Sequence, residues 1–140
     1  MENKEQKSLR EKILEEMTVS YANTLEKNFE LSKKFVRITP EGKIDLLHKD
    51  KLTGVNQILL YLIGKLYSKE AGISTEAEVT NEELANELGI PSGSLLPWLK
   101  QLRDTNKIKS SKGGKYVKHF IQINIVERTL NGIDKKIKGI

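Results

Sequence analysis

The stretch GIPSGSLLPWLKQL, residues 89–102, carries the pattern on which the predicted fold depends. A glycine and a proline stand at its start, and an apolar series at helical spacing follows: Leu95, Trp98, Leu99 and Leu102. Because residues three and four apart share one face of a helix, we expect a helix over about 94–105 that buries these four side chains.

The residues just before this stretch predict a second helix, over 81–88. Thr80 and Glu83 have the spacing of a capping box, and Val79 and Leu84 have that of a hydrophobic staple. Gly89 follows the last helical residue, where a glycine adopts a positive φ at little cost. The two helices are therefore joined by a tight turn at Gly89, and Ile90 re-enters the core.

Further towards the amino terminus, three more elements are expected. Apolar residues at every fourth position predict one long amphipathic helix over about 8–33. Two alternating runs around Pro-Glu-Gly-Lys predict a β-hairpin over 35–48. A wide apolar stripe, with Thr53 as its cap, predicts the most buried helix of the chain, ending near Gly72.

Two strand-like runs follow the 94–105 helix, in KIKSSKGGKYVKHFIQIN, residues 107–124. Gly113 and Gly114 between them suit a tight reversal, so we expect a two-stranded ribbon. The tail after residue 124 is expected to hold a short helix before Gly132 and then to fray.

Positive charge is concentrated around this ribbon. The chain of 140 residues has a net charge of +5, all of it in residues 80–140, which hold 11 Lys/Arg and 6 Asp/Glu. Residues 98–124 contain seven basic residues and a single acid, Asp104. A segment of this charge either binds a polyanion or forms a solvated lysine-rich face.

The order helix, helix, glycine turn, helix, basic ribbon resembles the winged helix-turn-helix domain of small prokaryotic transcription regulators, from bacteria, archaea or mobile elements. Ala85, Gly89 and Ile90 stand where that family has its close helix crossing, its turn and its core plug. The resemblance implies that the last helix enters the major groove of double-stranded DNA while the wing rests on the phosphate backbone. It implies these DNA-binding residues: Ser92, Gly93, Ser94, Leu96, Lys100, Gln101, Lys109, Lys112, Lys115 and Lys118.

Leu96-Pro97 departs from the usual polar surface of such a helix. A proline deep within a helix would clash with the carbonyl group of Gly93, but not if Ser94 is the cap and Pro97 lies in the first turn. The exposed tip is then apolar. It suits a thymine methyl group, which implies modest sequence specificity, and it equally suits a protein partner. A winged helix that docks a protein through Leu96-Pro97 is the alternative function.

The amino-terminal helix has two interpretations. It pairs with a second subunit to make a homodimer that meets symmetric half-sites, or it folds onto the hairpin of its own chain.

Other classes of function find little support in the sequence. There is no cysteine, and the two histidines, His48 and His119, are far apart, so we expect no metal site. Neither acidic pair, Glu15-Glu16 or Glu82-Glu83, resembles a catalytic dyad. No base neighbours Ser92 or Ser94 in the sequence. We therefore do not expect the chain to be an enzyme or to bind a cofactor. The absence of a long apolar run and of a signal core at the amino terminus predicts a cytoplasmic protein without membrane contact.

The predicted fold class is thus α+β, mainly α, in three parts. Residues 1–52 form a helix and hairpin extension, residues 53–124 the winged helix-turn-helix domain, and residues 125–140 a short helix and basic tail.

Overall fold

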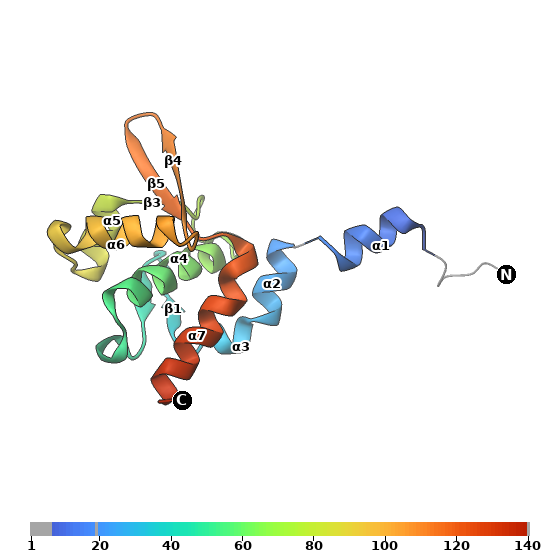
Figure 1. Cartoon of the computed structure of the whole chain (residues 1–140), viewed down its shortest axis with the longest axis horizontal. Coiled ribbons are helices and arrows are strands. Elements are labelled where there is room, and N and C mark those ends of the chain that lie inside the picture. Colours follow the sequence, from blue (N-terminus) through green and yellow to red (C-terminus); the bar gives the residue numbers. More distant parts are fainter. Residues whose placement is uncertain (1–6, 19, 140) are drawn as a thin grey trace.

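Helix α4 (Gly54–Glu70) is the centre of the fold in the computed structural model, which describes residues 7–18 and 20–139. It contacts helices α5, α6 and α7 and both strands of the first hairpin (Figure 1). Thr53 caps it, as predicted, by accepting a hydrogen bond from the Asn56 amide at 3.1 Å. The middle of α4, from Ile58 to Gly64, is buried without interruption, as befits a helix covered on all sides.

The first hairpin lies directly on α4. Strands β1 (Val36–Ile38) and β2 (Ile44–Leu46) pair antiparallel, as the sequence predicts. A Cβ at Gly64 would stand 2.7 Å from Ile44 Cγ2 and 3.0 Å from Val36 Cγ1. The glycine therefore permits the close approach of hairpin and helix, which share one hydrophobic core. A 3-10 turn, η1 (Lys49–Lys51), leads from the hairpin to Thr53.

The prediction of one long helix over 8–33 is wrong. The segment forms α1 (Leu9–Glu16), α2 (Tyr21–Lys27) and α3 (Phe29–Ser32). Ser20 accepts a hydrogen bond from the Asn23 amide, so a new helix begins where the old one should continue. No residue of α1 is buried, and Figure 1 shows this helix projecting away from the rest of the chain.

Helices α2 and α3, in contrast, belong to the core. Leu25 is buried among the core residues, and the Tyr67 hydroxyl of α4 donates a hydrogen bond to the Leu25 carbonyl at 2.6 Å. The Ser32 hydroxyl donates to the same Tyr67 oxygen at 3.0 Å. The chain thus covers one side of α4 with its own amino-terminal helices from α2 onward.

A three-stranded antiparallel sheet has the order β3-β5-β4. Its strands are β3 (Val79–Thr80), β4 (Lys109–Gly113) and β5 (Tyr116–Phe120). The predicted ribbon is confirmed as β4 and β5, joined through Gly114, whose φ is +63°. Strand β3 was missed by the sequence analysis, because two residues are too few to show an alternating pattern.

Helix α5 (Asn81–Leu88) has the bounds that the sequence predicts. Thr80 Oγ1 accepts from the Glu83 amide at 3.1 Å, and Gly89 ends the helix with a φ of +68°. The second half of the expected capping box does not form. The Glu83 carboxylate instead accepts the Tyr61 hydroxyl at 2.6 Å and lies 3.4 Å from Lys65 Nζ, which fastens α5 to α4.

Helix α6 (Ser92–Asp104) starts earlier than predicted. Pro91, not Ser94, is its amino-terminal cap residue, and the Ser94 and Leu95 amides bond to the Pro91 carbonyl. Pro97 is therefore the sixth residue of the helix and lies beyond its first turn. Because proline has no N–H group, the Gly93 carbonyl lacks its usual helical donor. The predicted inner face is confirmed: Leu95, Leu99 and Leu102 are buried.

The carboxyl-terminal segment is more regular than predicted. After a 3-10 turn, η2 (Ile123–Ile125), helix α7 (Val126–Lys138) passes through Gly132 instead of stopping before it. Val126, Leu130 and Ile133 are buried in the common core. Their spacing of four and three residues places them on one face of a helix. The burial of this apolar face outweighs the cost of about 1 kcal/mol for a glycine within a helix.

Candidate nucleic-acid interface

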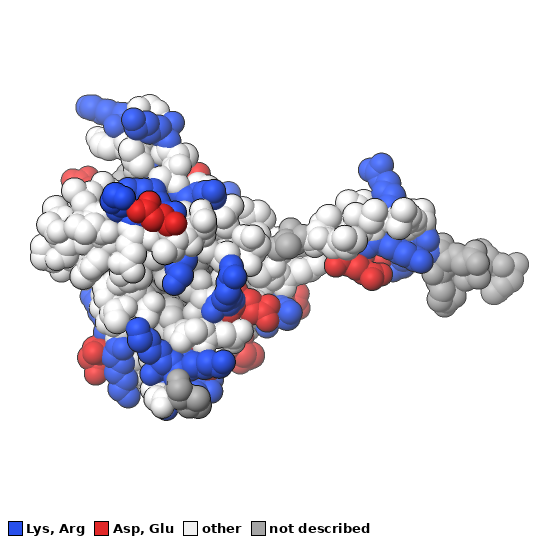
Figure 2. Space-filling model, in the orientation of Figure 1, with Lys and Arg blue, Asp and Glu red and all other residues white. Residues whose placement is uncertain are grey.

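The tip of the β4–β5 hairpin carries two of the predicted lysines at exposed positions. Lys112 and Lys115 flank the turn at Gly114, and Lys109 is exposed at the start of β4. None of these three has an ion-pair partner among the described residues. Figure 2 shows basic groups at the tip of this hairpin and, on the same side of the molecule, beside α6.

Lys118 differs from the other lysines of the ribbon. Its Nζ atom donates to Glu76 at 2.8 Å, and this hydrogen bond raises the pKa of Lys118 and lowers the pKa of Glu76. The ion pair ties β5 to the segment before β3. Lys118 therefore offers less free positive charge to a ligand than Lys112 or Lys115.

Helix α6 presents most of the remaining predicted residues to solvent. Ser92 and Gly93 are exposed in its first turn, Ser94 is half-buried, and Gln101 is exposed further along. Lys100 is also exposed, but it makes an ion pair of 2.8 Å with Asp104 one turn later. Leu96 exposes 53% of its surface beside an exposed Pro97, so the outer side of α6 is partly apolar, as expected.

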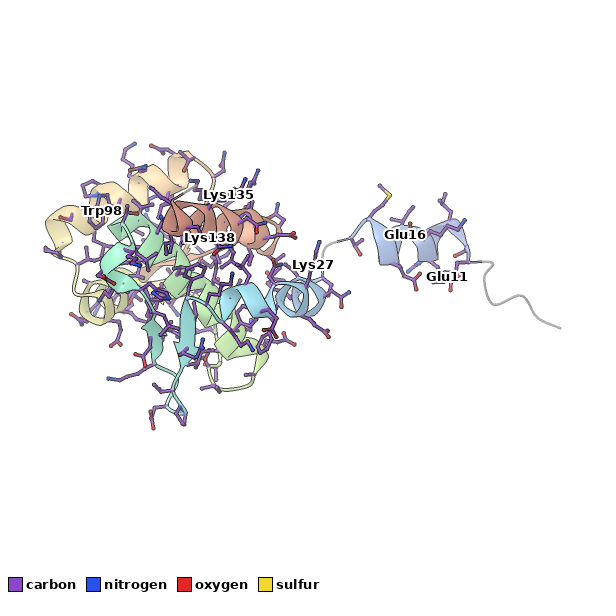
Figure 3. All side chains as sticks on the ribbon, turned by 90° about the horizontal axis from the view of Figure 1, so that it is seen from below. Glu11, Glu16, Lys27, Trp98, Lys135 and Lys138 are labelled. Carbon is purple, nitrogen blue, oxygen red and sulfur yellow. The ribbon has the colours of Figure 1, made fainter. Side chains whose placement is uncertain are left out.

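Trp98 lies on the inner side of α6, half-buried against the core, as the spacing predicts. A Cβ added at Gly54 would overlap its indole ring. Figure 3 shows Trp98 directed towards α4. The ring is thus part of the packing between α4 and α6 and is not a free stacking surface.

A buried histidine joins the ribbon to α5. His119 of β5 is 1% exposed. Its Nε2–H group donates to Asn81 Oδ1 at 2.5 Å, and its Nδ1 atom accepts from the Ser110 hydroxyl at 2.6 Å. Burial, together with the charge of Arg103, lowers the pKa of His119 to about 4. The ring is therefore neutral at pH 7 and bridges β4, β5 and the start of α5.

Arg103 lies on the exposed side of α6 that also carries Leu96, although the predicted set of DNA-binding residues omits it. It is exposed in the last turn of α6, seven residues after Leu96 and so on the same side of the helix. Its positive charge contributes to the lowered pKa of His119. Its spacing from Leu96 was the signal that could have identified it.

The described residues show no arrangement typical of a metal site. Within residues 7–18 and 20–139, no three His, Asp or Glu side chains gather at metal-binding distance. In the same part of the chain, no helix combines the length and the apolar character needed to cross a bilayer.

Comparison with known proteins adds no relative. No protein-family model, no curated protein and no solved structure matches the chain.

Proposed function

We propose that this chain binds double-stranded DNA through a winged helix-turn-helix unit that extends from α4 to β5. The order α4, β3, α5, Gly89 turn, α6, β4 and β5 supports the proposal, because it is the order of that fold. One observation at the ribbon tip carries the function. Lys112 and Lys115 are exposed there and make no ion pair in the described structure, and they lie on the side of the molecule where the outer face of α6 is also exposed to solvent.

In this proposal α6 enters the major groove with its amino-terminal half leading. Ser92 and Gly93 contribute free amide groups at the helix start, where the helix dipole favours a phosphate. Gln101 and Lys100 reach base edges or backbone from the next turns. Lys109, Lys112 and Lys115 bind phosphates beside the groove, which fixes the position of the protein without reading sequence.

The composition of the outer face of α6 predicts low sequence specificity. Leu96 and Pro97 donate no hydrogen bond, and the ammonium group of Lys100 is shared with Asp104. Discrimination between base pairs in the major groove rests mainly on donors and acceptors. We therefore expect most of the affinity to come from phosphate contacts, in a small DNA-binding protein of the transcription-regulator type.

Helix α1 supports a dimer as part of this proposal. Leu9, Ile13 and Met17 are exposed at intervals of four residues, so they form one apolar row on a helix that has no buried residue. Lys7, Arg10 and Lys12 lie towards one end together with Glu11, and Glu15 and Glu16 lie at the other, where Glu15 pairs with Lys7 of the same chain at 2.5 Å. An antiparallel pair of α1 helices would cover both apolar rows and place opposite charges together.

The alternative function is protein docking through α6. The exposure of Leu96 beside Pro97 favours it, because an apolar helix tip suits a protein pocket as well as a thymine methyl group. In that case the ribbon lysines form a solvated face and contribute no affinity for a duplex.

Titration of a fluorescent duplex of random sequence at increasing salt distinguishes the two functions. DNA binding requires that log Kd rises linearly with log salt, with a slope of about 0.9 per phosphate contact. Leu96→Asp places a negative charge in the groove and should weaken this binding. A protein that shows no binding to a duplex even at low salt would refute the DNA proposal and leave docking.

A further inference from the structure

A hollow of about 520 Å³ lies between α4, the turn after α6, and α7, away from the predicted DNA-binding residues. We call it the basic hollow and define it by six of its lining residues: Asn56, Asn106, Lys107, Arg128, Gly132 and Lys136. Its floor is apolar, formed by Leu59, Ile125 and Ile133. No aspartate or glutamate lines it.

The charges of α7 are divided between two sides of the helix. Glu127 and Asp134 are seven residues apart and so lie on one side, where they pair with Lys27 at 3.3 Å and Lys34 at 3.7 Å. Figure 3 shows Lys27 on α2 beside α7. The acidic residues of α7 therefore pair with α2 and with the segment after α3, and they do not neutralise the other side.

The other side of α7 faces the basic hollow with uncompensated positive charge. Arg128, Gly132 and Lys136 follow one another at intervals of four residues and form a row along the helix. Lys107 approaches from the turn after α6. Within the described part of the chain, none of these three basic groups makes an ion pair or a side-chain hydrogen bond.

Gly132 lies between Arg128 and Lys136 in the wall of the basic hollow. It lies in the interior of α7, where a glycine costs about 1 kcal/mol relative to alanine. Neither its φ nor its packing requires a glycine, because a Cβ added there would meet nothing within 4 Å. What the missing side chain does provide is open space between Arg128 and Lys136, in the wall of the basic hollow.

The polar groups around the basic hollow also suit an anion. Asn56 lines the hollow and lies in the first turn of α4, at the positive end of that helix dipole. The carboxyl end of α6, which is the negative end of its helix dipole, disfavours an anion. The Lys107 amide reduces this effect because it donates a hydrogen bond to the Leu102 carbonyl at 2.9 Å. The amide groups of Asn56 and Asn106 add neutral hydrogen-bond donors.

We propose that the basic hollow binds a phosphate group, held by Arg128, Lys136 and Lys107 across the gap left by Gly132. An arginine with two lysines and no carboxylate is a set of residues that favours phosphate over neutral ligands. The phosphate belongs either to a duplex that continues past the end of α6 or to a free phosphorylated small molecule. The site goes beyond the proposed function, because it holds whether or not α6 enters a groove.

The full chain titrated with sodium pyrophosphate tests this site. Amide chemical shifts of Asn106 and Gly132 should move and saturate, whereas sodium chloride at equal ionic strength should not move them. Arg128→Gln and Lys136→Gln should each weaken pyrophosphate binding about tenfold, the usual effect of one charge-assisted hydrogen bond. Lys138→Gln is the matched control: it removes the same charge from the same helix, but Lys138 pairs with Asp134 at 3.1 Å.

Gly132→Leu closes the gap without changing the charge. It should abolish pyrophosphate binding while the thermal unfolding curve stays in place or shifts upward. Chemical shifts that move equally with chloride, or binding that is lost equally in Lys138→Gln, would overturn the proposal. So would pyrophosphate binding that persists unchanged in Gly132→Leu.

A labelled duplex of about 20 base pairs then identifies the source of the phosphate. Duplex that displaces pyrophosphate, and that binds more weakly to Arg128→Gln, assigns the basic hollow to the DNA backbone. Duplex that binds without displacing pyrophosphate assigns it to a free phosphorylated ligand. If the chain binds pyrophosphate but no duplex, the proposed function fails and the phosphate site stands.

Discussion

The indole of Trp98 occupies the space beside Gly54 that any side chain at that position would need. Gly54 is the first residue of α4 and Trp98 lies in the middle of α6, so this contact sets how closely the two helices cross. The glycine is required by packing alone, because it is absent from the residues with positive φ.

We expect Gly54→Ala to lower the free energy of unfolding by about 1–3 kcal/mol, because the new methyl group forces Trp98 out of its position. Urea unfolding followed by tryptophan fluorescence measures both the loss and the displacement. Gly93→Ala is the control: this glycine also lies in a helix, but a Cβ there meets nothing within 4 Å. It should leave stability unchanged or raise it by up to about 1 kcal/mol. Equal stability of both variants would show that the packing of the Trp98 ring does not require a glycine at position 54.

Protonation of His119 should destabilise the fold in mild acid. The pKa of a histidine is about 6.5 in an unfolded chain, and that of His119 is lowered to about 4 in the fold. Between these values the unfolded chain binds more protons at this residue, so the contribution of His119 to stability is constant above about pH 6.5 and falls as the pH decreases towards 4. The shift corresponds to a loss of about 3 kcal/mol.

Urea unfolding between pH 7.5 and pH 4.5 measures this loss. His119→Gln should be less stable than the wild type at pH 7 but should show a shallower decline, because its side chain does not titrate. His48→Gln, at an exposed position, should follow the wild-type profile. Parallel profiles for the wild type and His119→Gln would contradict the assignment of the titration to His119.

Removal of the charges at the ribbon tip should reduce the salt dependence of duplex binding. Lys112→Gln combined with Lys115→Gln should lower the slope of log Kd against log salt by about one unit for each lost phosphate contact. Lys43→Gln combined with Lys51→Gln removes two charges at exposed positions near the first hairpin and serves as the control. A control that lowers the slope as much would mean that the net charge, and not the ribbon, attracts the duplex.

A chain that begins at Ser20 should remain folded but lose the dimeric mass that the proposed pairing of α1 helices gives the full-length chain. Helix α1 buries no residue, so its removal should change the unfolding free energy by less than about 0.5 kcal/mol. Sedimentation equilibrium gives the mass, and Met17→Glu, at a residue 76% exposed, should reproduce the loss in the full-length chain. A dimer that survives both changes has its interface elsewhere.

The parts of the fold that the sequence predicts are those with strong local signals. Thr80 and Gly89 mark the ends of α5 through one hydrogen bond and one backbone angle, and neither depends on distant residues. Gly114 fixes the ribbon in the same way. The apolar face of α6 follows from spacing alone, because Leu95, Leu99 and Leu102 must share one side of any helix.

The remaining features depend on tertiary contacts. The break at Ser20 separates exposed Leu9 from buried Leu25, a difference that equal apolar spacing does not reveal. Helix α7 continues past Gly132 because its buried side meets α4, which local propensity does not register. The basic hollow was also missed, since Lys107 and Arg128 are 21 positions apart in the sequence and meet only after folding.

The hydrogen bonds of His119 have a mechanical consequence for the ribbon. One neutral ring holds Ser110 and Asn81 at the same time. The bond to Ser110 joins the two strands of the hairpin, and the bond to Asn81 ties the base of the hairpin to the first residue of α5, so the hairpin cannot swing away from α5 without breaking it. The distance between the lysines at the tip and the open side of α6 is thus set before any ligand arrives. A binding partner that contacts both the lysines and α6 would meet a preorganised surface, so binding would cost little conformational entropy of the protein.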